Sequence, residues 1–175
     1  MTLTDAAAAS DLNEVITAGH DQLWQALGAC GTWWSGADRV AAIAEARQAL
    51  RCELCRARLE ALSPMMVAGK HDSISNMPEL AVDLIHRLTT DPGRLSKDWA
   101  SQVIESITEE AYVELATVIC VQYVIDSYSR CLGAPLRELP IAGEGEPSRI
   151  RPQGVGDVGA WVSQSLDKSL ANVSR

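Results

Sequence analysis

The segment YVELATVICVQYVIDSYSRCLG, residues 112–133, decides the fold class of this 175-residue chain. Its stretch from Leu115 to Ile125 is almost wholly apolar, which is typical of a central helix buried on most sides. Thr108 and the two glutamates after it form the start signal of that helix, and Gly133 marks its end. We therefore expect one long helix at the centre of the domain.

Four further helices are expected around it, because apolar residues recur at helical spacing between start and stop signals. They should run from Ser10 to Gly28, from Ser35 to about Leu62, from Pro78 to about Thr89, and for a short stretch from Ser96. Strand patterns are missing, since the β-branched residues fall into helical rows. The sequence predicts an all-α protein, a compact multi-helix bundle.

The bundle should occupy residues 1–139 as one domain, followed by an arm, residues 140–175, that begins rich in Gly and Pro. Within the arm, Asp157 is expected to cap a terminal helix. The apolar stripe of that helix would be Val158, Trp161, Val162, Leu166 and Leu170. Such a helix either folds back on its own subunit or grips a neighbouring one.

The composition narrows the class of partner. The chain carries a net charge of −8 and a pI of about 4.8, so nucleic acid and acidic membrane surfaces are disfavoured. No stretch approaches the ~18 uncharged apolar residues of a membrane span, and the N-terminus lacks the basic start of a secretory signal. We expect a cytoplasmic protein whose five cysteines are reduced.

Cys52 and Cys55 form a C-x-x-C pair within the second expected helix, and in an intracellular protein this spacing points to redox chemistry. On an unbroken helix, with about 100° per residue, Glu45 and Cys52 lie only about 20° apart. Gln48, Cys55 and Leu59 fall on the same side. A carboxylate, an amide and two thiols should therefore share one face.

Basic residues near the pair favour a thiolate. The surrounding arginines are Arg47, Arg51, Arg56 and Arg58. His71, in a loop, and His86, on the third helix, are the histidines most able to approach the thiols, and either could act as a base. His20 is expected to be a surface or packing residue of the first helix.

Two other interpretations of the cysteines remain. Both could be small buried hydrophobic residues that happen to have this spacing. A zinc half-site is the least favoured, because no second C-x-x-C or H-x-x-x-H completes four ligands. No cofactor and no metal are expected.

The central helix also carries a polar row formed by Gln122, Asp126 and Arg130. It predicts either an ion pair between Asp126 and Arg130 at a subunit interface or a surface that faces a substrate, and Glu114 is equally ambiguous. The two cysteines of this helix, Cys120 and Cys131, are expected to be packing residues.

Three segments together resemble the peroxidase-related branch of the alkylhydroperoxidase D and carboxymuconolactone decarboxylase superfamily. They are RQALRCELCRARLEALSP (47–64), IHRLTTDPGRL (85–95) and the central helix quoted above, and the likeness covers roughly residues 20 to 140. The resemblance implies an all-helical fold, assembly into homo-oligomers based on dimers or trimers, and thiol-based reduction of organic hydroperoxides.

By the same resemblance, Cys55 would attack the peroxide and Cys52 would resolve the sulfenic acid as a disulfide, which a dithiol would then reduce. The family's peroxidases carry a histidine between the cysteines and another four residues after the second. These positions hold Glu53 and Leu59 here, and the family's glutamate falls at Val40.

The sequence thus favours a thiol-dependent oxidoreductase that acts on a small hydroperoxide, with Cys52, Cys55, Glu45 and His86 as catalytic residues. One alternative is a non-catalytic oligomeric helical protein that binds a small ligand or a partner. Another is a decarboxylase or isomerase in which Glu45 or His86 acts as base.

Overall fold

The computed structural model describes residues 3–151, 153–156 and 160–165, and within them the all-α prediction is confirmed. The described residues form six α-helices, two short 3₁₀ turns and one pair of two-residue strands. In chain order these are α1 (Leu3–Gly28), α2 (Gly36–Ala49), α3 (Glu53–Glu60), η1 (Pro64–Met66), α4 (Glu79–Thr90), η2 (Pro92–Arg94), α5 (Lys97–Ile107), α6 (Glu109–Cys131), β1 (Val155–Gly156) and β2 (Gln164–Ser165).

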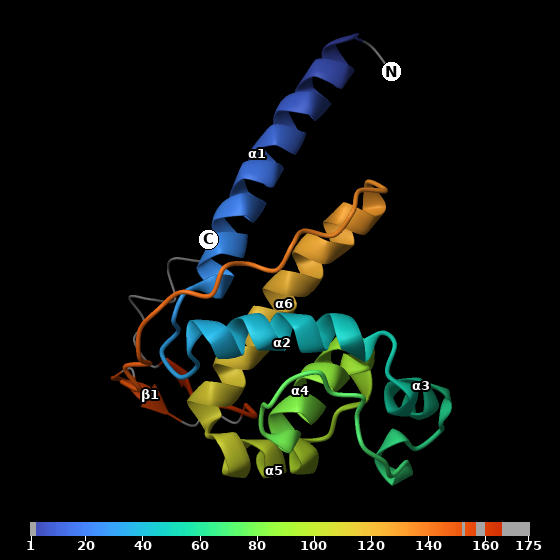
Figure 1. Ribbon diagram of the computed structural model, residues 1–175, viewed down its shortest axis with the longest axis vertical. Helices are drawn as coiled ribbons and strands as arrows, with labels where there is room; N and C mark the ends of the chain where they lie inside the picture. Colours follow the sequence, from blue (N-terminus) through green and yellow to red (C-terminus); the bar gives the residue numbers. More distant parts are fainter. Residues whose placement is uncertain (1–2, 152, 157–159, 166–175) are drawn as a thin grey trace.

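Helix α6 runs through the centre of the molecule, with α2, α4 and α5 packed around its first half (Figure 1). Leu115 and Val118 of α6 are fully buried against residues such as Ile43 of α2 and Leu84 of α4. The predicted long central helix is therefore confirmed, but it is not buried on most sides, because Thr117, Cys120, Tyr123 and Val124 are exposed. Thr108 begins it as expected, because its side chain accepts a hydrogen bond from the backbone N–H of Ala111.

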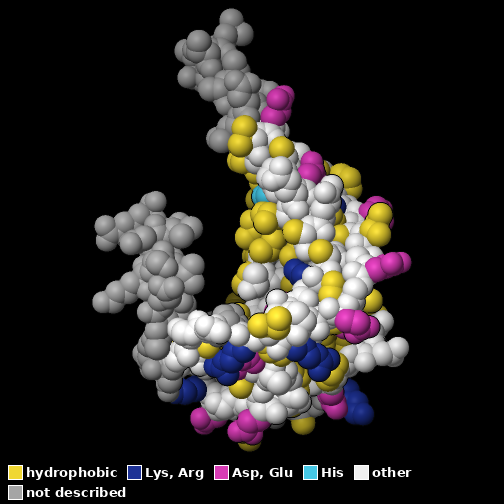
Figure 2. Space-filling model, turned by 90° about the vertical axis from the view of Figure 1, so that its left-hand side faces the viewer, with side chains coloured by type: hydrophobic (Ala, Val, Ile, Leu, Met, Phe, Trp, Pro, Cys, Tyr) yellow, Lys and Arg dark blue, Asp and Glu magenta, His cyan; other side chains and the backbone are white. Residues whose placement is uncertain are grey.

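The N-terminal part of α1 and the C-terminal part of α6 project from this body in the same direction (Figure 1). The chain that follows α6 returns alongside α1. There the indole N–H of Trp24 donates to the carbonyl of Glu138 at 2.9 Å, and the backbone N–H of Gly143 donates to the carbonyl of Gly28 at 2.8 Å. Figure 2 shows hydrophobic side chains gathered on the flank of the projecting part.

The second helix differs most from the sequence expectation, because it does not run from Ser35 to Leu62. Ser35 caps α2 in a capping box with Asp38, as predicted, but α2 ends at Ala49 and a turn at Leu50 and Arg51 separates it from α3. Neither Gly nor Pro marks this break in the sequence. The face that Glu45 was expected to share with Leu59 does not form, and Leu59 is exposed.

Two other boundaries differ. Helix α1 begins at Leu3 rather than at Ser10. In the arm, residues 160–165 form bends and strand β2, with Ser165 opposite Val155 of β1, where a helix was expected. The hydroxyl of Ser163 donates to the carboxylate of Glu109 at 3.1 Å, which fixes this segment at the start of α6. The expected cap and most of its stripe, Asp157, Val158, Leu166 and Leu170, lie outside the described residues.

A search of the helices for membrane-spanning segments covered the described residues. None of them combines the length and the apolar character that crossing a bilayer requires.

Candidate functional site

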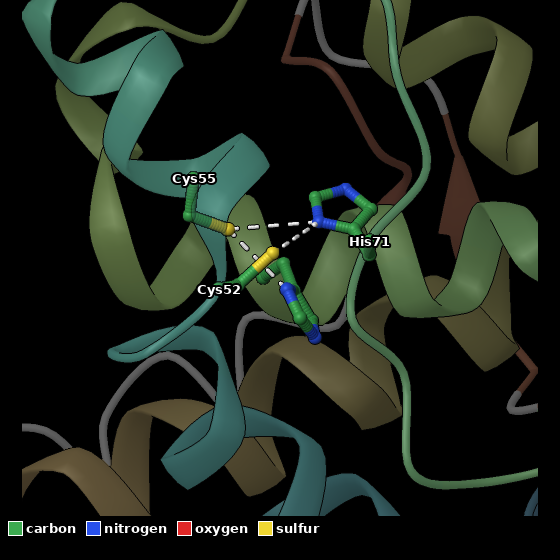
Figure 3. Close-up of side chains that lie close together, drawn as sticks. Cys52, Cys55 and His71 are labelled. Carbon is green, nitrogen blue, oxygen red and sulfur yellow. Dashed lines mark hydrogen bonds between the residues drawn. The ribbon is translucent and has the colours of Figure 1, made fainter.

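Two sulfurs and two imidazole nitrogens converge beside α3. Figure 3 shows both sulfurs facing the ring of His71. The Nδ1 atom of His71 lies 3.5 Å from Sγ of Cys52 and 3.6 Å from Sγ of Cys55. The Nδ1 atom of His86 lies 3.3 Å from Sγ of Cys55. All four donor atoms fall within 4.8 Å of one another. Three separate elements, α3 with its N-cap, the loop 67–78 and α4, thus supply one compact cluster.

The break after α2 places both thiols in this cluster. Cys52 is the N-cap of α3 and has an extended backbone, with φ −67° and ψ 127°. Its side chain does not cap the helix; instead the carboxylate of Asp72 accepts the N–H of Glu53 at 2.9 Å. The N–H of Asp72 in turn donates to Sγ of Cys52 at 3.4 Å. This exchange ties the loop to the start of α3 and holds the sulfur in place.

Glu45 reaches the cluster through His86 rather than along a helix face. Its carboxylate accepts a hydrogen bond at 3.0 Å from Nε2 of His86, and both side chains are fully buried. The other carboxylate oxygen accepts the hydroxyl of Ser73 at 2.7 Å and the N–H groups of Ile74 and Ser75 at 2.8 and 2.7 Å. Because Nε2 of His86 keeps its proton and donates it in the hydrogen bond to the carboxylate, the Nδ1 lone pair of His86 faces Cys55.

Asp83 has the corresponding position behind His71. Its carboxylate accepts from Nε2 of His71 at 2.8 Å and from the guanidinium of Arg58 at 2.7 Å. The indole N–H of Trp99 and the guanidinium of Arg87 donate to it at 2.7 and 3.1 Å. His71 and His86 are therefore matched: each carries a carboxylate on Nε2 and presents Nδ1 to the sulfurs.

The two thiols have opposite acidities. Burial would raise the pKa of Cys52, but hydrogen bonds from the N–H groups of Asp72 and Cys55 and from His71 outweigh it and lower that pKa below the usual thiol value. Burial and the neighbouring charge of Cys52 raise the pKa of Cys55 to about 12. The electrostatics favour a thiolate on Cys52 and a neutral thiol on Cys55.

The pKa values of the histidines and of Glu45 behind the thiols are also shifted. Burial would lower the pKa of His71, but the hydrogen bond to Asp83 raises it above the usual histidine value. Burial lowers the pKa of His86 in spite of Glu45. The pKa of Glu45 is lowered as well, because hydrogen bonds from Ser75 and Ser73 outweigh the effect of burial. His71 is therefore the more basic of the two imidazoles and His86 the less basic.

The structure brings together Cys52, Cys55 and both histidines named from the sequence, His71 and His86, whereas Glu45 joins them through His86 and not along the predicted helix face. Sequence reasoning missed Asp83. Its position offered a signal, because Asp83 and His86 stand three residues apart and therefore on one side of the third helix.

Other sequence-based expectations turned out differently. Of the arginines around the cysteines, Arg51 and Arg56 are exposed, and Arg47 binds Asp126 of α6 instead of a cysteine. The expected ion pair between Asp126 and Arg130 is present at 3.9 Å, but the closer partner of this buried carboxylate is Arg47, which donates to both of its oxygens at 2.9 and 2.8 Å. The expected packing residues of α6, Cys120 and Cys131, are exposed rather than buried.

The described cavities of about 500–600 Å³ lie elsewhere. The largest is lined by Trp33, Arg39 and Glu114 among others, and Glu114 there accepts the backbone N–H groups of Thr32 and Trp33. At the cluster itself, Cys52 is 2% and Cys55 5% exposed. Both sulfurs are therefore largely shielded from solvent.

Chemically, the cluster combines two soft sulfur donors with two oriented imidazole lone pairs. Such a set can exchange electrons and protons as a dithiol, and it can also coordinate a soft divalent metal. Comparison with family models, with curated proteins and with solved structures found no match to this chain.

Proposed function

We propose that the protein is a thiol-dependent oxidoreductase that reduces small organic hydroperoxides through Cys52 and Cys55. The observation that carries this proposal is the convergence of both sulfurs on Nδ1 of His71, together with the contact of Cys55 with His86. A neighbouring base and a neighbouring thiol are what sulfenic acid and disulfide chemistry require. The resemblance of the sequence to the alkylhydroperoxidase D superfamily points in the same direction.

Cys52 is the attacking thiol in this proposal, in the reverse order from that implied by the family resemblance. Its thiolate attacks the terminal peroxide oxygen, the O–O bond breaks, and the departing alkoxide takes the proton of His71 to give an alcohol. Cys52 then carries a sulfenic acid. The Asp72 and Cys55 N–H groups at the start of α3 stabilise the thiolate that this step needs.

Cys55 resolves the intermediate. Its proton passes to Nδ1 of His86, and its sulfur attacks the sulfur of Cys52, so that the S–O bond breaks and the leaving hydroxide takes that proton from His86 to become water. In sum, two thiols and one hydroperoxide give a disulfide, an alcohol and water. An external dithiol then reduces the disulfide. Glu45 is a positioning residue, because it fixes the tautomer of His86 without touching a sulfur.

The experiment uses metal-free protein in a Cys120→Ser/Cys131→Ser background, which removes the two exposed thiols. One equivalent of tert-butyl hydroperoxide should remove two thiols and lower the intact mass by ~2 Da. Cys55→Ser should instead stop at the sulfenic acid, with a gain of ~16 Da, and Cys52→Ser should react far more slowly.

The two single variants separate the order of the thiols from the activity itself. A sulfenic acid that accumulates in Cys52→Ser and not in Cys55→Ser would restore the order that the family resemblance implies. Thiols that stay unchanged in the otherwise unmodified background would overturn the proposed activity. The decarboxylase or isomerase alternative would need Glu45 or His86 to touch a substrate, and both side chains are fully buried.

Self-association is part of the same proposal, since the family resemblance implies a homo-oligomer. The projecting helices support it: Val15 and Leu23 of α1 and Tyr123 and Val124 of α6 leave about half or more of their area exposed, at 69%, 48%, 51% and 58%. Sedimentation equilibrium should give a dimer or a trimer-based mass. Val124→Glu should shift that mass towards the monomer, whereas a monomeric parent would contradict the assembly.

A further inference from the structure

The structure assigns a tetrahedral Zn²⁺ site to Cys52, Cys55, His71 and His86, whose donor atoms all lie within 4.8 Å of one another. This inference does not depend on the proposed peroxidase activity. It also revises the sequence-based view that a zinc half-site lacks its other ligands. The missing pair is supplied by two histidines, one from a loop and one from α4, with no motif spacing between them.

The distances match those of a metal-bound set. With Zn–S of about 2.3 Å and Zn–N of about 2.0–2.1 Å, tetrahedral geometry places sulfur and nitrogen ligands about 3.6 Å apart. Three of the four sulfur–nitrogen distances are 3.3, 3.5 and 3.6 Å. Nδ1 of His71 is almost equidistant from both sulfurs, whereas a single S–H···N hydrogen bond would draw it towards one of them.

Both histidines carry the support that metal ligands require. A ligating histidine usually donates its second N–H to a carboxylate or carbonyl, which fixes its tautomer and strengthens it as a donor. Nε2 of His71 lies 2.8 Å from Asp83, and Nε2 of His86 lies 3.0 Å from Glu45. Asp83 and Glu45 are themselves held by several further donors, so the orientation of both rings is set before a metal arrives.

Charge and burial favour the same ion. Two thiolates neutralise Zn²⁺, so the buried site would carry no net charge on its ligands and metal. Cys52, Cys55 and His86 are buried, and four protein ligands leave no open coordination position. These are the features of a structural zinc site, which is closed, rather than of a catalytic one, which keeps a position for water.

The position of the site in the fold indicates a structural role for such a metal. Beside the site, α3 packs through a small separate cluster formed by Ala49, Cys52, Leu54 and Cys55, with Val67 against it. A metal bound by α3, the loop 67–78 and α4 would cross-link this region to the main bundle. Small units with little hydrocarbon core commonly gain stability in this way.

The test uses tag-free full-length protein, reduced and then depleted of metal with a chelator. It should take up one equivalent of Zn²⁺, and Co²⁺ added in its place should give the intense visible d–d bands of tetrahedral coordination with a sulfur-to-cobalt charge-transfer band. Octahedral Co²⁺ spectra, or no saturable uptake at all, would overturn the site. This measurement needs no variant and therefore does not depend on the folding of one.

Variants locate the ion. His71→Ala and Cys52→Ser should weaken Zn²⁺ binding by more than about 100-fold, and Asp83→Asn by about 10–100-fold through His71. His20→Ala and Cys120→Ser change a histidine and a cysteine outside the cluster and should bind as the parent does. Zinc binding that survives in the first two variants and is lost in the controls would place the ion elsewhere and overturn the assignment.

The two proposals fail separately. Zinc uptake without any hydroperoxide-dependent thiol loss would support the metal site and overturn the peroxidase. Thiol loss in metal-free protein that shows no zinc uptake would do the reverse.

Discussion

The main bundle and the region of α3 are held together by different forces. Around α6, buried side chains such as Leu115, Ile43 and Leu84 exclude water over several helices. Around α3, the separate apolar cluster has four buried members, and sulfurs, imidazoles and carboxylates occupy the space beside it. The comparison indicates that hydrocarbon burial stabilises the bundle, whereas polar contacts or a metal must stabilise the α3 region.

The largest expected effect is the loss of stability when a buried leucine is truncated to alanine, and it should differ between the two regions. Leu115→Ala removes a fully buried side chain from the bundle and should lower the free energy of unfolding by about 3–5 kcal/mol. Leu54→Ala, in the smaller cluster, should cost about 2 kcal/mol, because that side chain lies nearer the surface. Urea unfolding of metal-free protein measures both. Equal losses would remove the energetic difference between the regions.

Zinc should stabilise the α3 region selectively. At a free Zn²⁺ concentration of 100 times Kd, binding to the folded state adds about 2.7 kcal/mol to the free energy of unfolding. Hydrogen exchange should show the added protection first in residues 52–60 and 67–72, and least in α6, which the bundle already protects. Protection spread evenly over all helices would contradict a local cross-link.

Metal and peroxide should compete for the same sulfurs. A thiolate bound to zinc has its lone pair engaged, so one equivalent of Zn²⁺ should slow hydroperoxide-dependent thiol loss about 10-fold or more, which corresponds to about 1.4 kcal/mol in the barrier. Stopped-flow measurement of residual thiols, with and without a chelator, gives this ratio. When oxidation does occur, the pair of thiolates with its bound Zn²⁺, one hydroperoxide and two protons give the disulfide, an alcohol, water and free Zn²⁺. An unchanged rate would show that the ion and the reactive thiols are separate.

The smallest expected effect tests whether the start of α2 is independent of the site. The Ser35 side chain accepts the N–H of Asp38, and Ser35→Ala should cost about 1 kcal/mol through the loss of this cap. Zinc affinity and the rate of thiol oxidation should stay at the parent values, because Ser35 lies at the far end of α2 from Cys52. A large change in either would indicate that the bundle and the site are coupled through α2.

Local signals in the sequence predicted much of the fold. The apolar run of α6, the capping serines of α2 and α5 and the Pro-Gly stop after α4 all act within one or two helical turns. Such signals depend on neighbouring residues only, so they can be recognised without knowing the tertiary structure. The same holds for the C-x-x-C spacing, which identified the two sulfurs of the candidate site.

The remaining features of the site depend on contacts that are distant in the sequence. Glu45 was singled out because of helical spacing to Cys52, yet the helix breaks between them and the carboxylate acts through His86, 41 residues away. The cap of α3 comes from Asp72 rather than from a residue at its own start. No local pattern predicts either arrangement, because each depends on how the loop 67–78 packs between α3 and α4.

The amino-acid sequence by itself determined the helices other than the separate α3, most of their ends and the pair of thiols, because hydrophobic periodicity and capping act over a few residues. Only the tertiary structure decided that α2 stops before Cys52 and that two histidines with carboxylates behind them meet both sulfurs. The physical reason is that these groups come from four segments of the chain. Their meeting depends on the packing of α3, α4 and the loop 67–78 against the bundle, which sequence spacing does not encode.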